Sequence, residues 1–394
     1  MQYRPHALKA CVVKVPANQP RCGVCTQKLV KNGKTSSGRT RWRCKQCGAS
    51  STQSREDLSR RAEFTVFLAW INGKQRQEAH ATSERTFRRR AQWCWNVIPE
   101  APVTGEIHQQ IMLDGTYFNG WCVLIAYTGS HVVAWQWCDR EKHASWSALL
   151  QRIPAPAVAI VDGHKGLESA LKQHWKETRV QRCMFHIQQN IRTHLTMRPK
   201  LDAGKELLAL TKTLTPIEDL DQAAAWMGEF ASWTARWEGF LRHRTYAKKN
   251  TARPSHVPAG QTWWYTHLRL RRARATLATV VASGHLFTWL STSVESQRVD
   301  RTTSPLEGGI NAGIKHLLRD HRGLSDTHAQ RAVDWYLYQR TEARQDPWQL
   351  VRPEHWKPER KHVVVVEEPV GPAVYDTAFS AEDGNGIQKG WGGR

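Results

Sequence analysis

The segment from residue 106 to residue 187 carries the pattern that most restricts the fold of this chain. The runs HQQIMLDGTYF, WCVLIAYTG and HVVAWQWCDR predict three strands, joined by short turns at Asn119-Gly120 and Gly129-Ser130. HASWSALLQRI then predicts a helix, AVAIVD a short buried strand, GLESALKQHWKE a second helix and RVQRCMFHI a fifth strand. Three antiparallel strands followed by alternating helices and strands predict a mixed α/β sheet.

This order of elements is typical of an α/β ribonuclease-H-like domain, in which the first and fourth strands are neighbours. Asp114 lies on the first predicted strand and Asp162 ends the fourth, so we expect the two carboxylates to converge. Two carboxylates at one site repel each other unless divalent cations lie between them. The pair predicts a site for phosphodiester cleavage assisted by two metal ions. A turn-forming role is the ordinary alternative for a single Asp at a strand end.

A third acid is expected on a later helix, and Glu307 is the candidate. Ser304 as N-cap with Glu307 three residues on also makes a capping box, which alone would account for a Glu at this position. The capping box does not account for Gly308-Gly309, because each Gly costs about 1 kcal/mol inside a helix. Glycines here permit close approach of a strand or of a DNA backbone. Asp300 and Glu295 are the fallback acids.

Polar residues follow Glu307 at four-residue spacing and would lie on one face of that helix. One acid followed by an amide and two cations fits a metal ligand beside a phosphate clamp. The residues of this face that we expect to contact DNA are Asn311, Lys315 and Arg319, with Arg322 just beyond them.

Two CxxC pairs predict a zinc ribbon over residues 18–52. Cys22, Cys25, Cys44 and Cys47 have the spacing of two knuckles that hold one structural Zn²⁺ through four thiolates. Zinc ribbons bind DNA, RNA or protein. The basic and aromatic side chains of the intervening hairpin favour nucleic acid, namely Arg41, Trp42 and Arg43.

Residues 58–99 predict two helices with a short polar break, the outline of a helix-turn-helix. Thr82 or Ser83 would cap the second helix. Its basic side chains would meet phosphates or base edges, namely Arg85, Arg88 and Arg89. A basic solvated helix with no DNA contact is the alternative.

Residues 188–300 have an almost entirely helical pattern and predict an all-α insertion. Basic runs there are expected to contact phosphates, among them Arg271 and Arg272. Trp263 and Trp264 follow a Pro/Gly loop and cannot both face one core, so one of them is a candidate for stacking on an exposed base. Residues 301–345 would return to the catalytic core, and residues 346–394 predict a flexible tail.

The charge of the chain predicts a polyanionic partner. Lys and Arg number 57 against 35 Asp and Glu, a formal net charge of +22. The chain contains no run of about 18 apolar residues, so we expect no membrane-spanning helix. The N-terminal residues lack the apolar core of a signal peptide. Nine cysteines in 394 residues are too few for a disulfide scaffold, so we expect a reducing, intracellular location.

Four segments resemble the signatures of bacterial insertion-sequence transposases of the DDE class with a Mutator-like catalytic domain. They are LDGTYF, IVDGHKGL, RCMFHIQQNI and SPLEGGINAGIKHLLRDHRGLS, and the resemblance spans about residues 20 to 345. It implies a catalytic triad of Asp114, Asp162 and Glu307 that holds two Mg²⁺ or Mn²⁺, with a helical insertion before the Glu-bearing helix.

The resemblance also maps a Cys-x-x-His motif of that family to Cys183 and His186. Two ligands are too few for a closed zinc site. We expect His186 to support the metal ligands or to position DNA and not to bind metal itself, and a half-buried strand end is the alternative.

The leading functional hypothesis is therefore a DNA transposase of the bacterial cytoplasm, associated with the nucleoid. Its partners would be transposon-end DNA and target DNA, and synapsis of two ends implies a homodimer or higher homo-oligomer. The alternatives are a non-catalytic DNA-binding repressor derived from a transposase, and a structure-specific nuclease of the same fold that cuts without joining.

Overall fold

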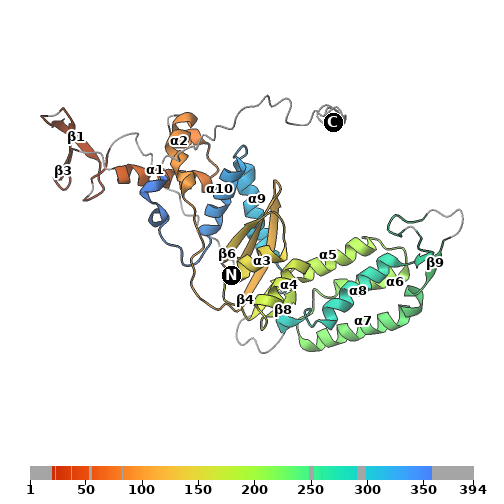
Figure 1. Cartoon of the computed structure of the whole chain (residues 1–394). Helices are drawn as coiled ribbons and strands as arrows, with labels where there is room; N and C mark the ends of the chain where they lie inside the picture. Colours follow the sequence, from red (N-terminus) through yellow and green to blue (C-terminus); the bar gives the residue numbers. More distant parts are fainter. Residues whose placement is uncertain are drawn as a thin grey trace, which may run out of the picture. The chain divides into compact units, whose positions relative to one another are not determined.

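The computed structural model describes residues 20–22, 24–36, 38–52, 56–81, 83–247, 253–258, 260–290 and 299–356 (Figure 1). The chain divides into two units, Met1–Arg352 and Pro353–Arg394. Of the second unit, the described part is a 3₁₀ turn at Pro353–His355 and the residue after it. Most of the predicted tail therefore lies outside the described residues, as do Thr82 and the fallback acid Glu295. The rest of the description concerns the first unit.

The N-terminal elements begin with a small antiparallel sheet in the order β1-β2-β3. Its strands are β1 (Leu29–Lys34), β2 (Thr40–Cys44) and β3 (Ser50–Ser51). Helix α1 (Glu56–Asn72), a 3₁₀ turn at Gln77–His80, helix α2 (Glu84–Ala91) and a second 3₁₀ turn at Gln92–Asn96 follow. Ser83 caps α2, because its hydroxyl accepts a hydrogen bond from the Thr86 amide at 3.2 Å.

The central sheet has five strands in the order β6-β5-β4-β7-β8. They are β4 (Gln110–Phe118), β5 (Trp121–Tyr127), β6 (Val132–Cys138), β7 (Val158–Val161) and β8 (Arg179–Arg182). The first three form the predicted antiparallel meander, and β4 pairs in parallel with β7. The predicted adjacency of the first and fourth strands is thus present. All four residues of β7 are buried, as its unbroken apolar run requires.

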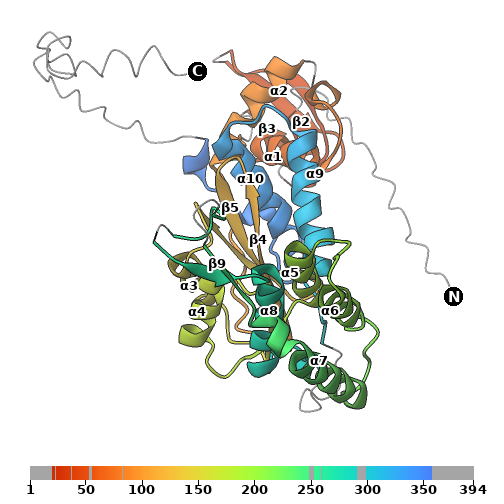
Figure 2. The ribbon, with the colours of Figure 1, turned by 90° about the vertical axis from the view of Figure 1, so that its right-hand side faces the viewer.

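Helices cover both faces of this sheet. Helices α3 (His143–Leu150) and α4 (Lys165–His174) lie on one side of β4 and β5, and α9 (Ala312–Asp320) and α10 (Asp326–Tyr338) on the other (Figure 2). Asp334 joins α10 to β6, because its Oδ1 accepts hydrogen bonds from the indole nitrogens of Trp135 at 2.9 Å and Trp137 at 2.7 Å.

The fifth strand ends earlier than the sequence predicted. RVQRCMFHI was expected to be a strand throughout, but β8 stops at Arg182 and helix α5 spans Met184–Leu195. The reason is that Ile187 and Ile191 recur at helical spacing and pack into the core of the helices that follow. His186 therefore lies in the first turn of a helix and not at a strand end.

The predicted insertion is largely helical. Helices α5, α6 (Asp202–Lys212), α7 (Leu220–Leu241) and α8 (Leu268–Ala282) lie side by side (Figure 1) around a core that contains Trp226 and Trp233. The sequence analysis did not predict the hairpin of β9 (Arg244–Tyr246) and β10 (Trp263–Tyr265). A 3₁₀ turn at Thr288–Leu290 ends the described part of the insertion.

The candidate third acid lies in a π-helix, η4 (Leu306–Asn311), that runs directly into α9. The predicted capping box at Ser304 is wrong. The carboxylate of Glu307 accepts its hydrogen bond from the hydroxyl of Thr303, and the Thr303 carbonyl accepts from the Glu307 amide at 3.0 Å. Helix formation begins one residue earlier than expected, which makes Thr303 the capping residue.

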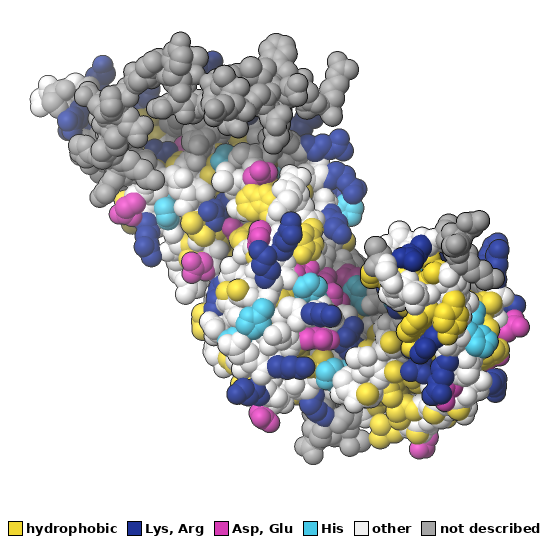
Figure 3. Space-filling view, turned by 45° about the vertical axis from the view of Figure 1, so that its right-hand side comes forward, with side chains coloured by type: hydrophobic (Ala, Val, Ile, Leu, Met, Phe, Trp, Pro, Cys, Tyr) yellow, Lys and Arg dark blue, Asp and Glu magenta, His cyan; other side chains and the backbone are white. Residues whose placement is uncertain are grey.

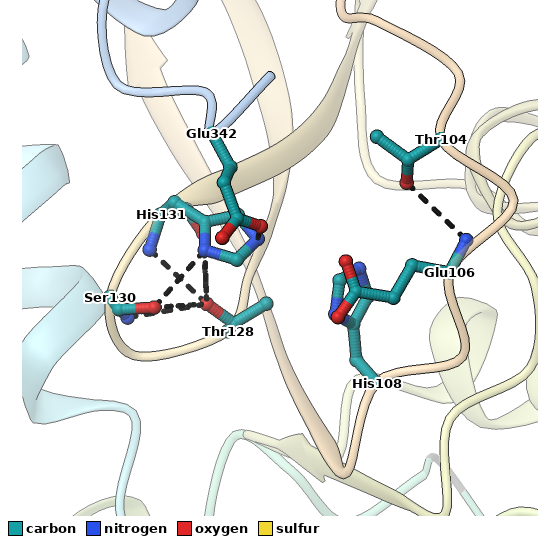
Figure 4. Close-up of polar contacts among 7 residues, drawn as sticks. All are labelled: Thr104, Glu106, His108, Thr128, Ser130, His131 and Glu342. Atoms are coloured by element: carbon teal, nitrogen blue, oxygen red, sulfur yellow. Dashed lines mark hydrogen bonds and ion pairs between the residues drawn. The ribbon is translucent and has the colours of Figure 1, made fainter.

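A cluster of polar contacts fastens the segment after α10 to the sheet (Figure 4). His131 Nε2 lies 3.3 Å from Glu342 Oε2, and His108 Nδ1 lies 3.7 Å from Glu106 Oε1. The Val132 amide also donates to the Arg340 carbonyl at 2.8 Å. A 3₁₀ turn at Pro347–Leu350 completes this unit. None of the described helices combines the length and apolarity needed to cross a membrane.

Candidate active site

Asp114, in the middle of β4, and Asp162, directly after β7, lie side by side, and we call this place the acid edge of the sheet. The parallel register pairs Leu113 of β4 with Val161 of β7, so the next residue of each strand is one of these acids. Gly163 then turns the chain with φ +91°, and a Cβ there would lie 1.7 Å from the guanidinium carbon of Arg182. Glycine is therefore required at position 163 for two reasons: the backbone is in the left-handed region, and the Arg182 side chain leaves no room for a Cβ.

Asp114 is hydrogen-bonded to Asn311, a residue of the π-helix η4, which is far away in the sequence. Asn311 Nδ2 donates a hydrogen bond to Asp114 Oδ2 at 2.7 Å. Asn311 is 4% exposed, and its Oδ1 accepts no hydrogen bond from the residues that the structure describes. From the sequence, Asn311 was expected to contact DNA, whereas in the fold it is buried against Asp114.

The surroundings of Asp114 oppose its ionisation. Burial is the largest cause that raises the pKa of Asp114, to about 7, followed by the negative charges of Glu307 and Asp162. Like charges around one carboxylate favour a bound cation, which offsets their mutual repulsion.

A fourth acid, Glu141, lies close to the same edge, and the sequence analysis missed it. A Cβ on Gly115 would lie 2.5 Å from Glu141 Oε1, so the side chain of Glu141 covers Gly115. Burial, followed by the charge of Asp162, raises the pKa of Glu141. The signal available in the sequence was the Gly directly after Asp114, which makes room for a neighbour but does not identify it.

Glu307 meets the Cys-x-x-His motif on its other side. His186 Nδ1 lies 3.7 Å from Glu307 Oε1, and the donor atoms of Cys183, His186 and Glu307 all lie within 4.8 Å of one another. The fallback acid Asp300 is used elsewhere: its Oδ2 accepts from Gln110 Nε2 at 2.7 Å, and its amide donates back to Gln110 Oε1.

The predicted DNA-contacting residues of α2 and α9 are mostly exposed. Arg85, Arg89, Lys315 and Arg319 face solvent, as does Arg322. Arg88 is exposed too, but it pairs with Glu84 and donates to Gln77 Oε1 at 2.9 Å. Lys and Arg side chains are spread over the face of the molecule drawn in Figure 3, as the net charge requires.

Arg88 and Arg322 line the same cavity although they are far apart in the chain. Its volume is about 600 Å³, and Lys74 and Arg76 add two further cations to its wall. The α1–α2 region and the turn between α9 and α10 thus share one basic concavity.

The candidates in the insertion are partly occupied by internal contacts. The Arg244 guanidinium lies 4.0 Å from the ring centroid of Trp263, and the Arg271 guanidinium lies 3.6 Å from that of Tyr265. Arg271 also donates to the Leu241 carbonyl at 2.9 Å. Trp264 is half-buried and Arg272 is exposed.

The four N-terminal cysteines converge as the zinc-ribbon prediction required. Cys22 and Cys47 lie 3.4 Å apart through their Sγ atoms, as do Cys25 and Cys44. A tetrahedral Zn²⁺ with Zn–S bonds of about 2.3 Å needs sulfur separations of roughly 3.8 Å. Backbone hydrogen bonds involving Cys25 and Val24 lower the pKa of Cys22 to about 6, whereas contacts with the other cysteine thiols raise the pKa of Cys25 and Cys47. Arg41 and Arg43 are exposed on β2, and Trp42 packs partly against the cysteines.

Comparisons with known proteins give a family for part of this chain. Residues 122–254 match the model described as "Transposase, Mutator family". The transposase for insertion sequence element IS905 of Lactococcus lactis subsp. lactis (strain IL1403) is 28% identical over 158 residues, which are 36% of this chain and 39% of that protein. The transposase for insertion sequence element IS6120 of Mycolicibacterium smegmatis is 37% identical over 132 residues, which are 30% of this chain and 37% of that protein.

These matches confirm the predicted resemblance to bacterial insertion-sequence transposases. The chain matches less than two fifths of the length of both curated relatives. The family match contains Asp162, Cys183 and His186 and ends before Glu307, while Asp114 precedes it.

Proposed function

We propose that the chain is a DDE transposase with a ribonuclease-H-like catalytic domain, which binds the ends of an insertion sequence, cleaves there and joins the ends to target DNA. The observation that carries the proposal is the position of Asp114, in the middle of β4, beside Asp162, which directly follows β7, with the π-helix that carries Glu307 bonded to Asp114 through Asn311 at 2.7 Å. The family match supports the same function.

The residues at this edge suit two divalent cations. Carboxylate oxygens are the ligands that Mg²⁺ and Mn²⁺ prefer, and Asn311 Oδ1 adds an oxygen with no hydrogen-bond partner among the described residues. Asp114 would serve both cations, with Asp162 and Glu307 each holding one. When bound, such ions supply charge stabilisation and activate the attacking oxygen in phosphodiester chemistry.

In this proposal, side chains of the protein orient the metal ligands and hold the DNA phosphates. Asn311 keeps the Asp114 carboxylate in one orientation through its 2.7 Å hydrogen bond. Lys315, Arg319 and Arg322 steady the phosphates on either side of the scissile bond. Water is the first nucleophile and frees a 3′-OH, which then attacks target DNA by transesterification, so that no external energy source is needed.

DNA binding is assigned to the zinc ribbon, α2 and the exposed cations of the insertion. The ribbon's four thiolates would hold one structural Zn²⁺. We expect at least a homodimer, because two ends must be joined, and a location at the bacterial nucleoid. Cys22→Ser should release the zinc and weaken DNA binding at least several-fold, as measured by metal content and gel shift. Unchanged metal content would contradict the ribbon assignment.

The decisive test is a cleavage and strand-transfer assay in Mg²⁺ or Mn²⁺ with DNA that carries the ends of the element. Wild type is compared with Asp162→Asn, which keeps the size of the side chain and removes its charge. Joined products from wild type alone support the proposal. Cutting without joining would favour a structure-specific nuclease, and binding without cutting would favour a repressor derived from a transposase.

A further inference from the structure

We propose that Cys183, His186 and Glu307 form a binding site for a transition-metal ion, Zn²⁺ in the first place, separate from the zinc ribbon and sharing Glu307 with the acid edge. The sequence offered only two of these ligands, which are too few for zinc. The fold supplies the third from a residue more than a hundred positions away.

The backbone holds the three donors in place. Cys183 immediately precedes α5, and His186 follows three residues later, one turn along the same helix face. The Met184 amide donates to the Arg301 carbonyl at 3.1 Å, which fixes the approach to η4 beside the start of α5. All three donor atoms lie within 4.8 Å of one another, so small side-chain adjustments bring them to ligand distances.

The sulfur of Cys183 is prepared to be a thiolate. Its Sγ accepts a hydrogen bond from the Thr303 amide at 3.3 Å, and the Thr303 hydroxyl, which donates to Glu307, lies 3.2 Å away. The Thr303 amide thus gives the buried sulfur a donor that would stabilise a thiolate. Cys94 is equally buried, and burial raises its pKa, so burial alone does not produce this state.

The ring of His186 points to a ligand as well. Its Nδ1 is buried and makes no hydrogen bond with the described residues, and Glu307 Oε1 at 3.7 Å is too far to accept one. A metal ion bound between the two would give His186 Nδ1 the partner that it lacks, while Glu307 Oε1 already accepts from the Thr303 hydroxyl. One thiolate, one imidazole and one carboxylate form a three-ligand set with an open position, which suits Zn²⁺, whereas Mg²⁺ avoids sulfur.

Metal binding here would compete with catalysis. While Glu307 is bound to an ion held by Cys183 and His186, it cannot bind the catalytic cation that it would hold beside Asp114. Zn²⁺ should therefore inhibit the Mg²⁺-dependent reaction through this site. This consequence rests on the proposed function, whereas the metal site itself does not.

The test is the zinc content of the full chain after equilibrium dialysis against Zn²⁺. Wild type should bind two equivalents, one in the ribbon and one here. Cys183→Ser and His186→Gln should each bind one, and the matched control Cys94→Ser should keep two. One equivalent in wild type, or two in both ligand variants, would overturn the proposal.

Two further measurements guard against misfolding and separate the two proposals. If Cys183→Ser proves unfolded by circular dichroism, His186→Gln decides, because that side chain is 26% exposed, whereas Cys183 is fully buried. In a Cys22→Ser/Cys25→Ser chain, the remaining equivalent, loaded as Co²⁺, should show a thiolate charge-transfer band that disappears with Cys183→Ser. A band that persists would contradict the site.

Inhibition is measured by adding Zn²⁺ to the cleavage assay at fixed Mg²⁺. The Zn²⁺ concentration for half-inhibition, relative to each protein's own uninhibited rate, should rise at least about tenfold in Cys183→Ser and stay unchanged in Cys94→Ser. Equal inhibition of all three would contradict the competition. A chain without cleavage activity would contradict the proposed function, while the zinc content would still decide the metal site.

Discussion

Two aspartates that face the central sheet, Asp114 within β4 and Asp334 on α10, have different surroundings. Asp334 is 5% exposed and receives hydrogen bonds from Trp135, Trp137 and Arg331, the last at 2.9 Å. Asp114 receives one hydrogen bond from a neutral amide and is otherwise surrounded by the acids Glu307, Asp162 and Glu141.

This difference distinguishes Asp334, whose carboxylate stabilises the fold, from Asp114, whose carboxylate does not. Donors on three sides offset part of the cost of burying Asp334, although burial still raises its pKa. Asp114 lacks that compensation, so its ionised form costs stability until a cation arrives. A buried acid with few donors and several like charges is therefore a better sign of a functional site than burial alone.

The largest effect is expected from Asp114→Asn. Cleavage should fall at least about 10³-fold, roughly 4 kcal/mol of transition-state stabilisation, because a cation ligand is lost. DNA binding should be spared, and the melting temperature should stay equal or rise, since repulsion is removed. Assays of cleavage, gel shift and thermal unfolding measure the three effects.

The same outcome for cleavage is expected from Asp162→Asn and Glu307→Gln. Full cleavage by any of these variants would remove that residue from the triad. A Glu307→Gln chain that fails to fold would instead indicate that the bond with Thr303 is the main role of this Glu.

Asp334→Ala should have the opposite profile. Removing the acid leaves two indole N–H groups and a half-buried guanidinium without their acceptor, at a cost of about 3–5 kcal/mol in the free energy of unfolding. Denaturant titration measures the loss. A change below about 1 kcal/mol would mean that water replaces the carboxylate and that the comparison overstates its role.

The next largest effect is expected in the pH dependence of Mg²⁺ binding, which should depend on the Asp114 carboxyl. Its pKa of about 7 lies well above the unfolded value of about 4, so from pH 4 to 7 the unfolded chain releases a proton that the folded chain retains. Without metal, this group makes the fold less stable as pH rises through that window. Mg²⁺ must displace the proton, so its affinity should rise about tenfold per pH unit, or about 1.4 kcal/mol, up to pH 7.

Thermal shifts with Mg²⁺ between pH 5.5 and 7.5, compared in wild type and Asp114→Asn, measure this dependence. The same slope in both proteins would show that another group takes up the proton.

The smallest effect is expected from Asp139→Ala. Asp139 pairs with Lys142 at 2.7 Å, but both side chains are well exposed, and solvent screens such a pair so that it adds little to stability. It lies in the same loop as Glu141 and is a matched control for mutations there. A loss of cleavage in Asp139→Ala would indicate that the conformation of the loop matters, independently of the Glu141 carboxylate.

Local patterns predicted the parts of the site that depend on single elements. The alternation of residues 108–187 predicted five strands in order, and this order alone placed Asp114 beside Asp162. The cysteine spacing predicted the N-terminal cluster in the same way. Both predictions use only the geometry of neighbouring residues.

The features that were missed arise from contacts between distant segments. Glu141 and the bond from Asn311 to Asp114 depend on how a loop and a π-helix dock on the sheet. Competition between strand and helix at Cys183 was resolved by packing of Ile187 and Ile191, which the short apolar run did not reveal. The capping residue was missed by one position, because Thr303 and Ser304 are equally good caps in sequence terms.

The π-helix that carries Glu307 is joined to Asp114 across nearly two hundred residues, with the whole helical insertion between them. A ribosome adding about 5–20 residues per second would release the sheet with Asp114 and Asp162 many seconds before it released Glu307. In the proposed function, the ribbon and α2 would already be available to bind DNA during that interval. A nascent chain would therefore engage the gene's own surroundings before it acquired the means to cut them.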